Sequence, residues 1–272
     1  MYSQRNKYWP AYTWKVQTSY SKDIKGKVSK TLKISEEDFN RRYFDIFHKI
    51  NASFYHLKRL EEEQEIAIKV GEAVAKIEIP GTEKYPMRIT GSPHEPIDYE
   101  YEAFLVTIKS ALDFIAALIL ESFGQKGNTL GSLMGWIDKR KKRNKTSLEE
   151  KICLLLEKPN HRKLIESHWE TKRGRWTKRD FTVHWGKLKT RTTNISSGIQ
   201  GRSILQTKAL DPNESMEIDL LWEAEDTVGF CKNQFYQTCD LLISVLSVFI
   251  GKELKPGPRE SVCEQKQKRP LL

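Results

Sequence analysis

Arg179, Asp180 and His184 place a permanent cation, a short acid and an imidazole within six consecutive residues. Histidine is the side chain whose ordinary pKa lets it both accept and donate a proton near neutral pH, and a guanidinium can hold two phosphate oxygens at once. A neighbouring carboxylate can orient either group. These residue types at this spacing predict acid/base chemistry on a phosphodiester without a metal ion.

The chain around this motif is predicted to be mainly helical. Apolar residues recur at every third or fourth position from Phe39 to Leu60, behind an N-cap at Ser35. A second and more apolar helix is expected over 98–123, ending at Gly124 because glycine tolerates the left-handed conformation that closes many helices. Both helices are expected to bury their apolar residues in a bundle.

The later elements are marked by capping residues and breakers. A third helix is expected after Ser147, with a break at Pro159 because proline lacks a backbone N–H, and a last helix is expected over about 216–252. The segment 124–135 is rich in glycine and is expected to be a loose turn region. Alternation of apolar residues over 74–79 indicates one short strand.

These elements predict a single bundle with flexible ends. Residues 1–33 show no helical period and are expected to form an extended N-terminal arm. The helical bundle would occupy 34–254, with a loop or small β-hairpin inserted at about 190–215. Residues 255–272 contain three prolines without periodicity and are predicted to be a disordered tail.

Positive charge is concentrated around the motif. The whole chain carries a formal net charge of +10, whereas the window from Lys126 to Arg191 holds 19 Lys/Arg against 7 Asp/Glu, a net charge of +12. A local positive field attracts polyanions, with binding that weakens as salt rises. The window favours RNA as a partner, and a solvated charged surface is the alternative explanation.

The remaining composition indicates a cytoplasmic protein without a cofactor. Cys153, Cys231, Cys239 and Cys263 are far apart and include no Cys-x-x-Cys pair, so reduced thiols are expected rather than a zinc site or a disulfide framework. The longest apolar runs carry charged residues or are too short to cross a bilayer, and no apolar signal region opens the chain. We expect no membrane span and no metal.

Two further groups of polar side chains can be explained without catalysis. Acids on the second helix can in principle bind magnesium, but acids near a helix start also suit the helix dipole. The other histidines have no partner comparable to the one His184 has in Arg179, and they are expected to be surface or polar-core residues. The two groups are Asp98, Glu100, Glu102 and Asp113, and His48, His56, His94, His161 and His168.

The motif and its helical context resemble the HEPN superfamily, a group of helical bundles that includes many small RNases. The superfamily motif is an Arg, a polar residue, a few further residues and a His, and Arg179, Asp180 and His184 match it between the third and the last expected helix. The second-helix phrases at 99–104 and 110–115 are also similar to that group.

The resemblance implies an up-and-down bundle that acts as a metal-independent endoribonuclease and leaves a 2′,3′-cyclic phosphate. His184 would be the general acid/base, Arg179 the cation at the phosphate, and Asp180 the orienting group. An ideal helix turns residues five apart by about 140°, so the resemblance's homodimer, which brings two motifs together, would let Arg179 and His184 of different protomers meet. A toxin–antitoxin or antiviral setting is implied, with an antitoxin or regulatory partner.

Cations near the motif are candidates for holding the RNA backbone, namely Arg175, Lys178, Lys187 and Lys189. Two other functions stay open at this point. The same basic surface suits a non-catalytic RNA- or nucleotide-binding module, and a scaffolding bundle could use Asp180 in a structural salt bridge with an arginine.

Overall fold

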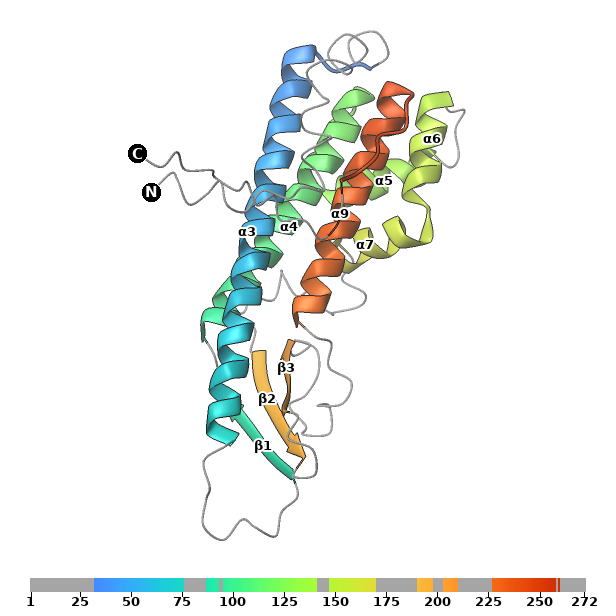
Figure 1. Cartoon of the computed structure of the whole chain (residues 1–272). Helices are drawn as coiled ribbons and strands as arrows, with labels where there is room; N and C mark the ends of the chain where they lie inside the picture. Colours follow the sequence, from blue (N-terminus) through green and yellow to red (C-terminus); the bar gives the residue numbers. More distant parts are fainter. Residues whose placement is uncertain are drawn as a thin grey trace, which may run out of the picture. The chain divides into compact units, whose positions relative to one another are not determined.

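A computed structural model describes residues 32–75, 87–92, 95–140, 147–169, 190–197, 203–209, 227–257 and 259. Most of these residues are helical, which confirms the prediction of a mainly α chain (Figure 1). The helices are α3 (Glu36–Ala75), α4 (Glu95–Ser122), α5 (Leu130–Arg140), α6 (Ser147–Leu156), α7 (Pro159–Trp169) and α9 (Thr227–Ile250).

The described residues fall into two compact units. The division lies within α3 after Tyr55, within α4 after Val106 and within α9 after Gln234. One unit holds the start of α3, the ends of α4 and α9, and all of α5, α6 and α7. The other holds the rest of the three long helices and the strands. We call them the first and the second unit.

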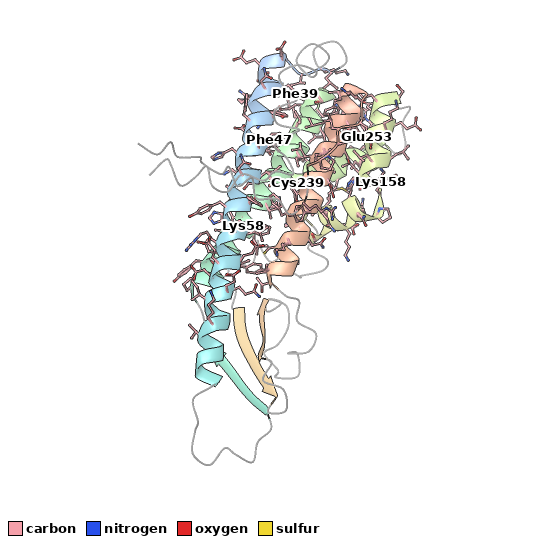
Figure 2. The ribbon with its side chains drawn as sticks, viewed as in Figure 1. Phe39, Phe47, Lys58, Lys158, Cys239 and Glu253 are labelled. Carbon is pink, nitrogen blue, oxygen red and sulfur yellow. The ribbon has the colours of Figure 1, made fainter. Side chains whose placement is uncertain are left out.

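The first unit is built around aromatic side chains of α3, α4 and α9. Phe39 of α3 and Phe123, just beyond α4, both meet Phe249 of α9, with ring centroids 6.5 and 6.2 Å apart. Phe123 also stacks on Trp136 of α5 at 5.3 Å. Figure 2 labels Phe39, which is fully buried. Each such ring contributes about 2–3 kcal/mol by leaving water, so these contacts fix the unit's core.

The buried face of α3 follows the apolar pattern of the sequence. The side chains predicted to line it are all buried. The predicted cap is also present, because Ser35 Oγ accepts a hydrogen bond from the Asp38 backbone N–H at 3.0 Å. The buried residues are Phe39, Tyr43, Ile46, Ile50, Phe54, Leu57 and Leu60.

The end of α4 and the start of α5 are set by hydrogen bonds. Gly124 has a φ of 65°, and its N–H reaches the Glu121 carbonyl while Gln125 N–H reaches the Leu120 carbonyl, as in a Schellman motif. The expectation of a loose turn region over 124–135 was wrong beyond its first residues, because α5 begins at Leu130.

Two side-chain caps explain the start of α5. Thr129 Oγ1 accepts a hydrogen bond from Ser132 N–H at 3.2 Å, and Asp113 Oδ1 of α4 accepts one from Leu130 N–H at 3.0 Å. Gly135 lies inside α5, where glycine is tolerated.

The second unit contains a three-stranded antiparallel sheet. Its strands are β1 (Met87–Ser92), β2 (Thr190–Ser197) and β3 (Ser203–Ala209), in the order β1-β2-β3. In register, Ile195 of β2 lies between Ile89 of β1 and Ile204 of β3. The region expected as a loop or small hairpin therefore carries β2 and β3, and β1 joins them from a distant part of the chain.

The strand predicted over 74–79 does not begin where it was expected. The alternation over 74–79 was expected to start a strand at Val74, but α3 continues through Val74 to Ala75. Glu72 and the two alanines at 73 and 75 are good helix formers, and they let α3 continue past Gly71. Residues 76–80 lie outside the described residues.

The predicted break at Pro159 is confirmed, since α6 ends at Leu156 and α7 begins at the proline. The expected start of the last helix, 216–226, and the arm 1–31 lie outside the described residues. Leu32 is buried, and Lys33 N–H donates to the Ser122 carbonyl at 2.9 Å, so the end of the expected arm joins the first unit.

The part of the chain that the structure describes has one helix long and apolar enough to cross a membrane, the stretch Pro96–Ser122 of α4. In the tested window, 61% is buried inside the protein. A helix in the core of a soluble helical bundle can be as long and as apolar as a membrane-spanning helix. The burial of Phe104, Ile108, Leu112 and Ile115 identifies α4 as a core helix of this bundle.

Candidate functional site

The residues predicted to do chemistry lie between α7, which ends at Trp169, and β2, which begins at Thr190. Residues 170–189 are outside the described residues, so the roles assigned to this motif and to its neighbouring cations stay predictions. They are Arg175, Lys178, Arg179, Asp180, His184, Lys187 and Lys189. The structure does describe the helices that lead to this segment.

The start of α7 is held against the end of α6 by a histidine. His161 is buried, and its Nδ1 lies 2.9 Å from the Leu155 carbonyl oxygen. Because a carbonyl only accepts, Nδ1 must carry the donated proton, which fixes the state of that ring nitrogen. His168 is also buried, near the end of α7. Both histidines are polar-core residues, one of the two roles expected for them.

Two arginines of the basic window, Arg140 and Arg162, are engaged in ion pairs. Arg140 of α5 lies 3.0 Å from the buried carboxylate of Glu149, and Arg162 of α7 lies 2.5 Å from Glu166. These pairs hold α5 to α6 and stiffen α7, so their positive charge is largely neutralised where it stands.

The lysines of the same window are exposed. They lie between α4 and α5 and along α5, α6 and α7, and they are Lys126, Lys139, Lys151, Lys158 and Lys163. Figure 2 labels Lys158, which follows α6. Exposed lysines can reach a polyanion without breaking a structural contact.

A second polar cluster lies in the second unit and was not predicted. We call it the His56 cluster, and it consists of His56, Arg59 and Glu63 of α3 with Glu100 of α4. His56 Nδ1 is 2.8 Å from Glu100 Oε2, and Arg59 Nε is 3.9 Å from Glu100 Oε1. Arg59 also contacts the buried Glu63 at 2.8 Å. His56 is part-buried and paired, which agrees with the polar-core role that was one of the two expected for it, but its partner Glu100 was not predicted.

The His56 cluster resembles the carboxylate–imidazole pairs that orient histidines in many sites. His56 and Glu100 are each about three-quarters buried, with 24% and 22% of the side chain exposed. The signal in the sequence was small, since the two residues are 44 positions apart. Only their place beside the buried stripes of α3 and α4 could have indicated a contact.

The acids considered for magnesium are used in contacts within the fold. Glu100 belongs to the His56 cluster, and Asp113 contacts Lys109 Nζ at 2.6 Å besides capping α5. The described residues contain no group of three or more His, Cys, Asp or Glu side chains that could hold a metal ion. The cationic partners explain the placement of Glu100 and Asp113.

A charged network joins α3 and α9 in the second unit. Glu61 lies between Lys58 Nζ at 2.5 Å and Lys232 Nζ at 2.9 Å. Burial opposes ionisation of Glu61, but the hydrogen bonds to both lysines outweigh it and lower the pKa of the carboxyl group. The network ties the start of α9 to α3.

The described cysteines are not candidates for nucleophilic catalysis. Cys153, Cys231 and Cys239 are free and buried. Desolvation raises the pKa of Cys239, labelled in Figure 2, well above the ordinary value, with a further contribution from Asp240. These thiols are core residues, as the sequence indicates, and Cys263 lies outside the described residues.

No protein-family model, curated protein or solved structure matches this chain.

Proposed function

We propose that this protein is a metal-independent endoribonuclease that resembles the HEPN superfamily. One observation carries the proposal: Arg179, Asp180 and His184 occur at the superfamily spacing between two helices, α7 and α9, of a mainly helical chain. The net charge of +12 around the motif supports RNA as the substrate.

In this proposal His184 removes the proton of the ribose 2′-hydroxyl and returns a proton to the leaving 5′-oxygen. The 2′-oxygen attacks phosphorus, the bond to the 5′-oxygen breaks, and a 2′,3′-cyclic phosphate remains. Arg179 stabilises the charge that develops on the phosphate oxygens, and Asp180 orients the cation or the imidazole. No metal ion or cofactor takes part in these steps.

The proposed active form is a homodimer. Side chains five residues apart on an ideal helix point about 140° apart, so one helix does not aim Arg179 and His184 at the same phosphate. Two copies related by a twofold axis bring Arg179 of one protomer to His184 of the other. An antitoxin or regulatory partner in a toxin or antiviral setting of the cytoplasm would restrain the enzyme.

Binding of the RNA backbone is assigned to cations near the motif. Arg175, Lys178, Lys187 and Lys189 would contact successive phosphates. The exposed lysines Lys126, Lys139, Lys151, Lys158 and Lys163 add positive charge within the same window of the sequence. Together they raise the encounter rate and make binding sensitive to salt.

The test is incubation of purified protein with RNA in excess EDTA. Wild type is expected to cut RNA to fragments with 2′,3′-cyclic phosphate ends, which mass spectrometry identifies. His184→Ala and Arg179→Ala are each expected to lower the rate by at least about 100-fold. His48→Ala is the matched control, because His48 is exposed on α3, and it should retain wild-type activity.

Equal RNA loss in wild type and both motif variants would overturn the catalytic assignment, and so would loss of activity in EDTA. The exposed lysines also favour a second candidate function, a non-catalytic RNA- or nucleotide-binding module. In that case RNA remains intact but shifts in a gel, and the logarithm of the affinity falls linearly with the logarithm of the salt concentration.

A further inference from the structure

The chain beyond α9 turns back on the helix instead of leaving it. Gly251 has a φ of 65°, which only glycine adopts readily, and Lys252 N–H donates to the Ser247 carbonyl at 3.2 Å. Leu254 N–H then donates to Ser247 Oγ at 3.0 Å. These contacts anchor the first residues after α9 to its last turn.

A second anchor lies at Arg259, which makes three contacts with α9. Its guanidinium NH2 is 3.2 Å from Asp240 Oδ2, and its guanidinium carbon is 5.5 Å from the centroid of the Tyr236 ring. Its backbone carbonyl accepts a hydrogen bond from the Tyr236 hydroxyl. An ion pair, a cation–π contact and a hydrogen bond thus hold Arg259 against α9.

The spacing of the anchors determines the path between them. Tyr236, Asp240 and Ser247 recur at four and seven residues, so they share one face of α9. The distance along the helix from Tyr236 to Ile250 is about 21 Å at 1.5 Å per residue. The eight residue-to-residue steps from Gly251 to Arg259 span about 26–29 Å when the chain is fully extended. The chain from Gly251 therefore returns along α9 in the antiparallel direction to reach Tyr236 and Asp240 with Arg259 (Figure 1).

The two anchors differ in strength. The first is part of the helix end, whereas the second includes an ion pair in contact with water, with 61% of the Arg259 side chain and 36% of the Asp240 side chain exposed. Exposed ion pairs and exposed cation–π contacts are weak and the former are screened by salt. The Arg259 anchor is therefore expected to be the weaker of the two.

We propose that residues 251–257 and Arg259 form a latch that closes over the Tyr236–Asp240–Ser247 face of α9, and that ionic strength controls its opening at the Arg259 anchor. The closed latch covers this helix face. The open latch exposes the face and frees the extended segment, without unfolding of the bundle.

Limited trypsin digestion of the full chain tests the latch. Trypsin cleaves after Arg259, and mass spectrometry quantifies the fragments that end there. Asp240→Asn removes the ion pair and is expected to raise this cleavage rate by about threefold. Tyr236→Phe keeps the ring but removes the hydroxyl donor, and it should raise the rate as well. Glu253→Gln is the matched control, since Glu253 is an exposed acid of the same segment, and its rate should equal that of wild type.

Salt provides the second readout. Raising the ionic strength from about 0.05 M to about 0.5 M shortens the screening length about threefold. At each salt concentration, the rate of cleavage after Arg259 in wild type is divided by the rate in the Asp240→Asn protein. This ratio should rise toward one as the ionic strength increases. Equal rates in wild type and Asp240→Asn at low salt would overturn the proposal. A rate that rises by the same factor in both proteins with salt would also overturn it.

Discussion

Arg42 and Arg41 are neighbours on α3, and replacing each with alanine is expected to have very different consequences. Arg42 holds the carboxylate of Glu121 on α4 with Nε at 3.0 Å from one oxygen and NH2 at 2.5 Å from the other. These side chains are only 20% and 27% exposed. Arg41 contacts Asp38 at 2.8 Å, but those side chains are 62% and 46% exposed. The two substitutions therefore compare a part-buried bidentate pair with a surface pair.

The expected loss in the free energy of unfolding depends on how deeply the remaining carboxylate is buried once its arginine is removed. Fully buried pairs lose about 3–5 kcal/mol when one partner is removed, and exposed pairs at most about 1 kcal/mol. With about a quarter of each side chain exposed, Arg42→Ala is expected to lower the free energy of unfolding by about 2 kcal/mol. Arg41→Ala is expected to lower it by no more than about 0.5 kcal/mol.

The helix dipole makes the loss of Arg42 more costly than the loss of the charge on Glu121. Glu121 lies in the last turn of α4, where the helix dipole disfavours an anion and favours a cation. The hydrogen bonds to Glu121 raise the pKa of Arg42 above its ordinary value, so the cation persists at all working pH values. Glu121→Gln keeps one acceptor and a well-placed cation, and its expected loss is about 1 kcal/mol.

Urea unfolding followed by circular dichroism measures these differences. With a slope of about 3 kcal/mol per M, the Arg42→Ala midpoint should fall by about 0.7 M and the Arg41→Ala midpoint by less than about 0.2 M. Equal midpoints for the two alanine variants would refute the argument from burial. A larger loss for Glu121→Gln than for Arg42→Ala would refute the argument from helix polarity.

Two further predictions concern the glycines and the acid limb of stability. Gly124→Ala should lower the free energy of unfolding by about 1 kcal/mol in thermal denaturation, because φ is 65° and a Cβ would lie 3.1 Å from Lys33 Cδ. Gly135→Ala should be neutral or should stabilise the protein by up to about 1 kcal/mol, because nothing lies within 4 Å of the added Cβ. Because the pKa of Glu61 is lowered from 4.5 in the folded protein, its stabilisation is complete above that pH and is lost as pH falls through the lower folded value. Urea midpoints should thus fall less on acidification below pH 4.5 for Glu61→Gln than for wild type, and identical pH profiles would contradict the lysine contacts.

Local signals predicted the helices well where neighbours in sequence decide the outcome. The buried stripe of α3, the Ser35 cap, the end of α4 at Gly124 and the break at Pro159 all depend on residues within one or two turns. The residues that could do RNA chemistry were likewise read from a six-residue pattern, and their arrangement stays a prediction because 170–189 lie outside the described residues.

Contacts between distant residues account for what the sequence did not predict. The start of α5 depends on Asp113, 17 positions before Leu130, and the His56 cluster depends on Glu100, 44 positions after His56. Strand β1 pairs with β2, whose partner residues lie about a hundred positions later in the chain. No periodicity encodes such pairings, because each partner alone looks like an ordinary helix or loop residue.

The hydrogen bond from Leu130 N–H to Asp113 Oδ1 has a consequence for the order in which the protein folds. An eleven-residue helix is too short to persist by itself in water, and this one receives part of its cap from another helix. We therefore expect α5 to become stable only after α4 has formed and placed the Asp113 carboxylate at Leu130 N–H. In that case the first turn of α5 forms late, because its cap depends on Asp113 of α4.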